Sequence, residues 1–339
     1  MCVLMDEKYM KLCIELALKG FPKAMPNPLV GCVIVHNDNI IGQGYHHKYG
    51  ENHAEVNAIN SVEDKSLLKE STLYVTLEPC AHFGKTPPCA NLIIQSKIPK
   101  VVIGSLDTFS EVNGKGIKAL KEAGITVKTS VLEDECRSIN KRFFTFHEKK
   151  RPYVILKWAK SSDGLIAPNN QTEPFWMTGK ESKKLVHQWR SEETAILVGK
   201  NTIIKDNPLL TTREINGKNP TRILIDKKLS LAINYAIFNH DATTYVVNES
   251  KESERHVKVD FNSFFPSLMK ALHQRGIQSL IVEGGAITLN SFIASNYWDE
   301  ARVFTSKKTL GNGIQSPVIE LDINKNIIID NDKLDYYFN

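Results

Sequence analysis

The stretch Pro79-Cys80-Ala81-His82-Phe83-Gly84-Lys85-Thr86-Pro87-Pro88-Cys89 follows a predicted buried strand and leads into a predicted helix. Upstream of it, His53-Ala54-Glu55 opens an earlier predicted helix. One imidazole and two thiolates suit Zn²⁺, and three protein ligands leave the fourth tetrahedral position for water. Zinc-bound water loses a proton near neutral pH, and Glu55 would carry protons to a leaving amine. The combination of H-x-E with two cysteines that each follow a proline is typical of zinc-dependent nucleobase deaminases.

This interpretation has one geometric condition and two alternatives. Residues two positions apart on a helix point to different faces, so His53 and Glu55 meet one metal ion only if the helix begins there. His82 is a candidate fourth ligand that would make the zinc structural, but we favour three ligands. A lone cysteine is usually a small buried hydrophobic residue. We expect that packing role for the other four cysteines, Cys2, Cys13, Cys32 and Cys136.

Strands and helices alternate on both sides of this stretch. The predicted helices of the first half are 6–19, 53–62, 89–97 and 115–123. The predicted strands are 30–35, 40–45, 71–77, 100–106 and 125–129. This alternation predicts an α/β layered sandwich.

A charged segment that ends in a proline, 148–152, is the predicted linker between domain 1–147 and domain 153–339. The second half repeats the α/β alternation. Its predicted strands are 152–159, 195–199, 222–225, 244–247 and 278–282, and its predicted helices are 180–190, 267–275 and 286–294. No G-x-G-x-x-G follows its first strand, which argues against a Rossmann dinucleotide domain. Glu283-Gly284-Gly285 at a strand-to-helix turn lets backbone N–H groups approach a phosphate, although two glycines alone are a weak signal.

The composition limits the possible partners. The chain has 339 residues with 43 basic and 38 acidic side chains, so a net charge of +5 demands no polyanion but suits a small phosphorylated substrate. No apolar run approaches the ~18 residues of a membrane span, and the acidic, amphipathic N-terminus does not resemble a signal peptide. We therefore predict a cytoplasmic protein with no nucleic-acid or membrane partner. All six cysteines lie in the first 136 residues, so any cysteine chemistry belongs to the first half.

The long spacing between Cys80 and Cys89 resembles one family closely, the bifunctional riboflavin-biosynthesis deaminase/reductases. Pro26-Asn27-Pro28, 30–35 and Gly44-Tyr45-His46 match the same family, and the resemblance covers nearly the whole chain. It implies a cytidine-deaminase-like α/β/α sandwich followed by a dihydrofolate-reductase-like α/β domain, and a homo-oligomer. It also implies two reactions: zinc-dependent hydrolytic deamination of a diaminopyrimidinone ribosyl phosphate, then NADPH-dependent reduction of its ribosyl group to ribityl.

The resemblance also assigns roles to individual residues. Contacts to the deaminase substrate fall on Asn27, His46, Lys85 and Asp107. Contacts to the reductase substrate fall on Lys157, Pro174, Arg190, Leu210, Arg213 and Glu283. Contacts to NADPH fall on Lys160, Trp176, Thr202, Asp206, Gly285, Ala286, Ile287, Thr288, Leu289, Asn290 and Ser291. The residue types agree, because amides and imidazoles read a pyrimidine edge and arginine and lysine bind phosphate.

Three departures from the family pattern stand out. Two prolines are missing between Asp107 and Gly116, and we expect a more flexible loop with unchanged chemistry. Pro174 replaces a usual serine. Lys160 stands where the family commonly has alanine, so its stem would crowd the cofactor or its ammonium would meet a cofactor phosphate. Two rival functions are a deaminase acting on tRNA or DNA bases and a zinc-stabilised binding protein without catalysis.

Overall fold

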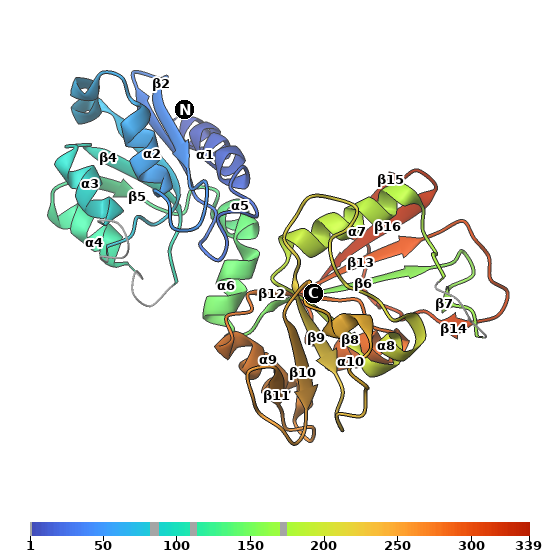
Figure 1. Cartoon of the computed structure of the whole chain (residues 1–339). Coiled ribbons are helices and arrows are strands. Elements are labelled where there is room, and N and C mark those ends of the chain that lie inside the picture. The colour runs from blue at the N-terminus through green and yellow to red at the C-terminus, as the bar shows by residue number, and fades with distance from the viewer. Residues whose placement is uncertain (1, 82–87, 109–113, 170–174) are drawn as a thin grey trace. The chain divides into compact units, whose positions relative to one another are not determined.

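The chain divides into two units, Met1–Lys149 and Lys150–Asn339, in the computed structural model of Figure 1. The structure describes residues 2–81, 88–108, 114–169 and 175–339. The division falls inside the segment 148–152 that the sequence predicts as the linker. Within the described residues, no helix is both long enough and apolar enough to cross a membrane.

The first unit is built on a five-stranded sheet with the order β2-β1-β3-β4-β5. Its strands are β1 (Gly31–His36), β2 (Asn39–Tyr45), β3 (Thr72–Leu77), β4 (Lys100–Ser105) and β5 (Thr126–Lys128). β1 is antiparallel to both β2 and β3, whereas β3, β4 and β5 are parallel to one another. Asn37 and Asp38 make the tight β1–β2 turn with φ of 47° and 60°, which Asn and Asp tolerate better than most residues.

Helices cover both faces of this sheet. They are α1 (Cys2–Leu18), α2 (Ala54–Ser61), α3 (Cys89–Gln95), α4 (Lys115–Glu122), α5 (Glu133–Ile139) and α6 (Lys141–Glu148), with a 3₁₀ turn, η1, at Lys65–Glu70. Side chains alternate across a strand. In β1, Ile34 lies in a core with residues of α2, α3 and α4, whereas Val33 and Val35 lie in a second core with residues of α1 and α5. The two cores make a three-layer α/β/α sandwich, as the sequence predicts.

The second unit is built on a nine-stranded sheet with the order β11-β10-β9-β8-β12-β6-β13-β16-β15. Its strands are β6 (Tyr153–Lys160), β8 (Ala195–Gly199), β9 (Thr221–Ile225), β10 (Thr244–Asn248), β11 (His256–Lys258), β12 (Ser279–Val282), β13 (Glu300–Thr305), β15 (Lys325–Ile329) and β16 (Asp332–Phe338). All neighbours are parallel from β11 to β13, and β16 and β15 continue the sheet antiparallel. A separate pair joins β7 (Leu165–Ala167) to β14 (Ile314–Gln315).

Two cores flank the nine-stranded sheet. Its helices are α7 (Lys180–Glu192), α8 (Lys200–Asp206), α9 (Phe264–Gln274) and α10 (Ala286–Ala294), with a 3₁₀ turn, η2, at Ala236–Phe238. Leu156 and Leu197 lie in one core with residues of α9 and α10. Ile155 and Ile196 lie in the other core with residues of α7 and α8.

Several parts of this unit differ from the sequence prediction, which lacks β7, α8 and β11. α9 begins at Phe264 rather than at residue 267, because Pro266 lies in the first helical turn, where its missing N–H costs nothing. No strand is predicted after residue 294, yet β13 lies inside the sheet between β6 and β16. Its Glu300 and Arg302 are charged but buried, with Arg302 Nε 2.6 Å from Glu300 Oε1, so the strand lacks an apolar pattern.

Candidate active sites

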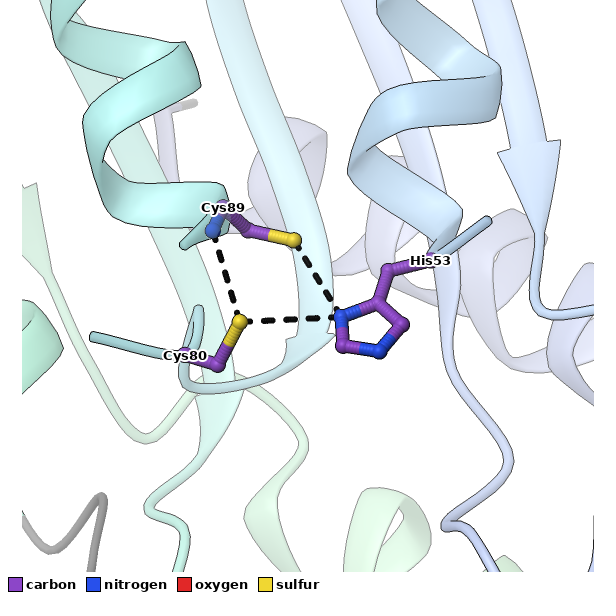
Figure 2. Close-up of side chains that lie close together, drawn as sticks. All are labelled: His53, Cys80 and Cys89. Atoms are coloured by element: carbon purple, nitrogen blue, oxygen red, sulfur yellow. Dashed lines mark hydrogen bonds between the residues drawn. The ribbon is translucent and has the colours of Figure 1, made fainter. Parts of the chain in front are cut away.

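The three predicted zinc ligands converge in the first unit (Figure 2). His53 is the N-cap residue of α2, with extended backbone at φ −71° and ψ 164°, and the helix begins at Ala54. This start satisfies the geometric condition for His53 and Glu55. Cys89 is the first residue of α3, and Cys80 follows the end of β3. The ligand atoms of all three residues lie within 4.8 Å of one another.

The donor set fits a tetrahedral zinc ion. His53 Nδ1 lies 3.6 Å from Cys80 Sγ and 3.3 Å from Cys89 Sγ. Zn–N and Zn–S bonds of ordinary length at a tetrahedral angle would separate nitrogen and sulfur by about 3.5 Å. The Cys89 backbone N–H donates to Cys80 Sγ at 3.3 Å. Hydrogen bonds from the Cys89 thiol and from His53 lower the pKa of Cys80 despite its burial, so this thiol readily becomes the thiolate that metals require.

Glu55 lies on the first turn of α2, next to the ligand set. Its carboxyl group is buried, with 3% of the residue exposed. Burial first, and then the charge of Cys80, raise its pKa to about 7, while His53 works in the opposite direction. A carboxyl group that exchanges its proton near neutral pH can act as both general base and general acid. This is the property that the predicted proton carrier needs.

Asn27 and His46 lie beside the ligand set and contact each other. Asn27 Nδ2 is 3.1 Å from His46 Nε2, and His46 Nδ1 is 3.0 Å from the Asn52 carbonyl oxygen. A carbonyl only accepts, so Nδ1 carries the proton and Nε2 accepts from Asn27. Burial lowers the pKa of His46, which favours this neutral form. The His46 and His53 rings are 5.5 Å apart, so the predicted substrate residues adjoin the metal site.

The other two predicted deaminase contacts have different outcomes. Asp107 is buried just beyond β4, and its backbone N–H donates to the Glu78 carboxylate at 3.4 Å. Lys85 lies outside the described residues, as does His82, the alternative fourth ligand.

In the second unit, three of the predicted substrate residues form a buried ion cluster. β6 and β12 are parallel and pair Leu156 with Val282, so the next residues, Lys157 and Glu283, stand side by side. Lys157 Nζ lies 3.8 Å from Glu283 Oε2. Arg190 of α7 binds the same carboxylate through both arms, with Nε to Oε1 at 2.9 Å and Nη2 to Oε2 at 2.7 Å. Burial opposes ionisation of Glu283, but the two cations outweigh it and lower its pKa to about 2.

The loop after α8 carries two of the three remaining substrate candidates. Leu210 is buried with φ of 56°, a left-handed conformation that is uncommon for leucine and marks local strain. Arg213 is exposed, and its Nη1 lies 3.3 Å from Thr211 Oγ1. Its backbone N–H donates to His187 Nδ1 of α7 at 2.9 Å. Since Arg190 is fully engaged by Glu283, Arg213 is the more available cation of this site.

The predicted cofactor residues gather where β8 and β12 end. Parallel strands bring their carboxyl ends to one edge, which is where open α/β sheets bind ligands. The Gly285 N–H donates to Thr202 Oγ1 at 3.1 Å, so the start of α10 contacts α8. Thr288 packs against Gly199 so closely that a Cβ at Gly199 would lie 2.7 Å from Thr288 Oγ1. Leu289 is fully buried in the core and therefore presents no side chain to a cofactor.

The remaining cofactor candidates are more exposed. Ile287, Asn290 and Ser291 lie on exposed parts of α10, and Ala286 is its first, partly buried residue. Trp176 is half exposed, and its carbonyl oxygen accepts from Lys308 Nζ at 2.5 Å. Lys160 is the partly exposed last residue of β6, and Asp206 is the exposed last residue of α8. Pro174 lies outside the described residues.

Two polar residues near these sites, Glu78 and His187, are not among the predicted site residues. Both are buried, with 3% and 1% of the residue exposed. Glu78 lies between the apolar strand β3 and the Pro79-Cys80 motif, and this position is the signal that could have found it. His187 lies one helical turn before Arg190, and only that spacing points to it.

Comparison with known proteins matches one family model to each of the two units. Residues 4–105 match the family model of the cytidine and deoxycytidylate deaminase zinc-binding region, and residues 152–329 match that of the RibD C-terminal domain. The chain thus combines a zinc-binding deaminase domain with a reductase domain.

Relatives with this same combination match the chain along most of its length. RibD of Aquifex aeolicus is 42% identical over 321 residues, which cover 91% of this chain and 89% of that protein. A crystal structure from Thermotoga maritima has a TM-score of 0.87 at 36% identity, and Acinetobacter baumannii RibD, form 1, has 0.88 at 30%. Each covers 99% of both chains. The chain belongs to the RibD family of bifunctional riboflavin-biosynthesis enzymes, so the predicted fold class and the predicted combination of a deaminase with a reductase are confirmed.

Proposed function

We propose that the chain deaminates 2,5-diamino-6-ribosylamino-4(3H)-pyrimidinone 5′-phosphate and then reduces the ribosyl group of the product to ribityl with NADPH. The Thermotoga maritima structure carries the name diaminohydroxyphosphoribosylaminopyrimidine deaminase and 5-amino-6-(5-phosphoribosylamino)uracil reductase. The observation that carries the proposal is the convergence of His53, Cys80 and Cys89 next to the buried carboxyl group of Glu55.

In the first unit, His53, Cys80 and Cys89 hold zinc, and zinc supplies a water molecule of lowered pKa. Glu55 accepts a proton from that water molecule and delivers a proton to the departing amine. Its pKa of about 7 suits both transfers. Asn27 and the neutral His46 bind the pyrimidine edge, since together they offer donors and acceptors close to His53. Asp107 and Lys85 complete the substrate contacts.

In the second unit, the ribosyl group of the substrate binds against a preorganised cluster of three charged residues, Lys157, Arg190 and Glu283. The carboxylate of Glu283 fixes both cations, so the cluster needs little rearrangement when the substrate arrives. Arg213 binds the phosphate because it is exposed and not engaged by Glu283. Leu210 and Pro174 complete the substrate contacts.

The cofactor occupies the edge formed by Thr202, Asp206 and the residues 285–291, with Trp176 on its nicotinamide side. NADPH supplies the hydride, and the protein orients it and excludes water. Leu289 contributes through the backbone, because its side chain is in the core. A cytoplasmic location, a homo-oligomeric assembly and the lack of a nucleic-acid partner stay predictions.

The test is Glu55→Gln in the full chain. The variant keeps its zinc, and deamination of the defined pyrimidine falls by about 10²–10⁴-fold, the usual contribution of a general acid–base. NADPH oxidation with the deaminated intermediate stays at the wild-type rate. Glu63→Gln, an exposed glutamate just beyond α2, is the matched control and leaves both rates unchanged. Unchanged deamination in Glu55→Gln would refute the assigned role.

A further inference from the structure

We propose that Glu78 is a positioning residue of the deaminase site. It holds Asp107 and the start of α4 against the turn that carries Cys80, and it thereby sets the affinity for the pyrimidine substrate. The proposal rests on the proposed role of Asp107 as a substrate contact. Glu78 itself touches neither the metal-ligand atoms nor the substrate in this assignment.

The Glu78 carboxylate is saturated with backbone donors. Oε1 accepts from the Gly116 N–H at 3.0 Å and from the Ile117 N–H at 3.2 Å. Oε2 accepts from the Gly114 N–H at 3.0 Å and from the Asp107 N–H at 3.4 Å. Hydrogen bonds to an ionised acceptor are about twice as strong as neutral ones, and this carboxylate is buried away from competing water. One side chain thus fixes two backbone stretches: Asp107, two residues beyond β4, and the first turn of α4.

The glycines of this region are explained by the same arrangement. A Cβ on Gly116 would lie 2.0 Å from the carbonyl oxygen of Pro79, so only glycine lets α4 begin this close to the turn. Gly114 has φ of 81°, a left-handed conformation that favours glycine. Pro79 lies between Glu78 and Cys80, so both the side chain and the backbone of this turn contact the start of α4.

Two consequences follow for the site. The four converging N–H groups form an anion-binding concavity that the chain's own carboxylate fills, so the substrate phosphate is not bound there. The backbone position of Asp107 depends on Glu78, which stands two residues before the ligand Cys80. Glu78 therefore connects the predicted substrate contact with the metal-ligand turn.

Only glutamate satisfies this geometry. Glutamine has the same shape, but its NH₂ group would face N–H donors in place of one carboxylate oxygen. Aspartate keeps the charge but is one methylene shorter. Both changes therefore loosen Asp107 and the start of α4, and aspartate loosens them less because it keeps four lone-pair sites for the donors.

The experiment measures KM and kcat of deamination separately in full-length Glu78→Gln and Glu78→Asp, together with zinc content and NADPH oxidation. We expect the deaminase KM to rise about tenfold or more in Glu78→Gln and by less in Glu78→Asp, with kcat within about threefold of wild type. Zinc content and the reductase rate stay unchanged. Amide hydrogen exchange at Asp107, Gly114 and Gly116 becomes faster in both variants. Glu78→Asp carries the test if Glu78→Gln does not fold.

The matched control is Asp6→Asn. Asp6 is also a buried carboxylate of the first unit, and it accepts from Tyr74 Oη at 2.9 Å and from Lys128 Nζ at 2.7 Å. We expect this variant to lose stability without a change in KM. An unchanged KM in both Glu78 variants, or an equal rise of KM in Asp6→Asn, would overturn the proposal. Wild-type protein that does not deaminate the pyrimidine would instead refute the proposed function, and the exchange measurement would still report on Glu78.

Discussion

The two sites of this chain are built in opposite ways. The metal site takes three ligands of distinctive type from a short part of the chain, between His53 and Cys89, and each ligand stands where a helix begins or just beyond a strand. The reductase site joins Arg190 to Glu283, which are 93 positions apart, through ordinary charged side chains. Its geometry comes from the register of the β6–β12 pair and from α7.

The difference determines what each site tolerates. In the proposed metal site, we expect each ligand to be needed because an open tetrahedral zinc ion has only three protein ligands. In the proposed reductase site, one carboxylate neutralises two buried cations, so we expect stability and activity to depend on the same group. Loss of a metal ligand therefore affects chemistry first, whereas loss of Glu283 affects the stability of its unit as well.

The largest expected effect is that of Cys89→Ala. The variant loses zinc, and deamination falls by at least ~10³-fold, because several kcal/mol of transition-state stabilisation are removed. NADPH oxidation by the deaminated intermediate is unchanged. Metal analysis and the two separate assays measure these outcomes. A chelator should give the same pattern in the wild type.

The matched control is Cys136→Ala, which removes a buried thiol of the core between the sheet and helices α1 and α5. This variant keeps its zinc and its deaminase activity. Zinc retained at full content by Cys89→Ala would show that the ligand set is wrong.

The second effect is that of Glu283→Gln. The change leaves Arg190 and Lys157 buried without a countercharge, and breaking a buried ion pair in this way costs about 3–5 kcal/mol. All four tryptophans, Trp158, Trp176, Trp189 and Trp298, lie in the second unit, so tryptophan fluorescence during denaturant unfolding reports on that unit. We expect its unfolding free energy to fall by this amount.

The control for Glu283→Gln is Glu252→Gln, which breaks the ion pair of a more exposed glutamate with Arg275. Exposed ion pairs contribute about 0–1 kcal/mol, so this variant stays close to wild type. An equal fall of the unfolding free energy in the two variants would show that the buried cluster stabilises the unit no more than an exposed ion pair does. The contrast between the two sites would then not hold.

The metal site is easier to predict from the sequence than the reductase site, because its residues lie close together in the chain. His53, Cys80 and Cys89 belong to rare residue types in a recognisable spacing, so zinc binding can be predicted from them before the fold is known. The contact between Lys157 and Glu283 depends on the pairing of Leu156 with Val282, and no local pattern encodes that register. The resemblance to a family points to those residues. It does not point to Glu78, whose partners are backbone N–H groups about 30 to 40 residues away in the chain.

The same reasoning explains the fold. Apolar strands such as β3 and β4 were found within a residue of their ends, because both faces are buried and the runs are continuous. β13 was not found, because its Glu300 and Arg302 are polar by sequence and acceptable inside only as a pair. A local sequence pattern does not reveal which charged residues pair over long distances in the chain. This limit applies both to β13 and to the cluster around Glu283.

A third, smaller effect concerns pH. Burial, and then the charges of Arg190 and Arg213, lower the pKa of His187 to about 4, and its Nε2 is buried without a hydrogen-bond partner among the described residues. Glu214 and Glu283 oppose this shift. Between pH 6.5, the usual pKa of an unfolded histidine, and pH 4, the unfolded chain binds more protons than the folded one. The contribution of His187 to the unfolding free energy is therefore fully present above about pH 6.5 and is lost as the pH falls toward 4.

His187→Gln removes this titration. We expect its unfolding free energy to fall less steeply with decreasing pH than that of wild type, by at most about 1.4 kcal/mol per pH unit between pH 6.5 and 4. Tryptophan fluorescence measures both profiles. Parallel profiles would mean that His187 has the same pKa in the folded and the unfolded chain, which would contradict the shift that burial and the two arginines cause.

The smallest effect is that of Lys160→Ala, which tests whether the reductase site departs from its family at the cofactor. Lys160 is the last residue of β6, paired with Thr305 of β13, and it is partly exposed. One exposed charge contributes under about 1 kcal/mol, so we expect the KM for NADPH to change by about threefold, with deamination unchanged. A higher KM would mean that the ammonium meets a cofactor phosphate, and a lower KM would mean that the side chain crowds the cofactor. An unchanged KM would show that Lys160 does not contact the cofactor. The end of β6 would then have no role in cofactor binding.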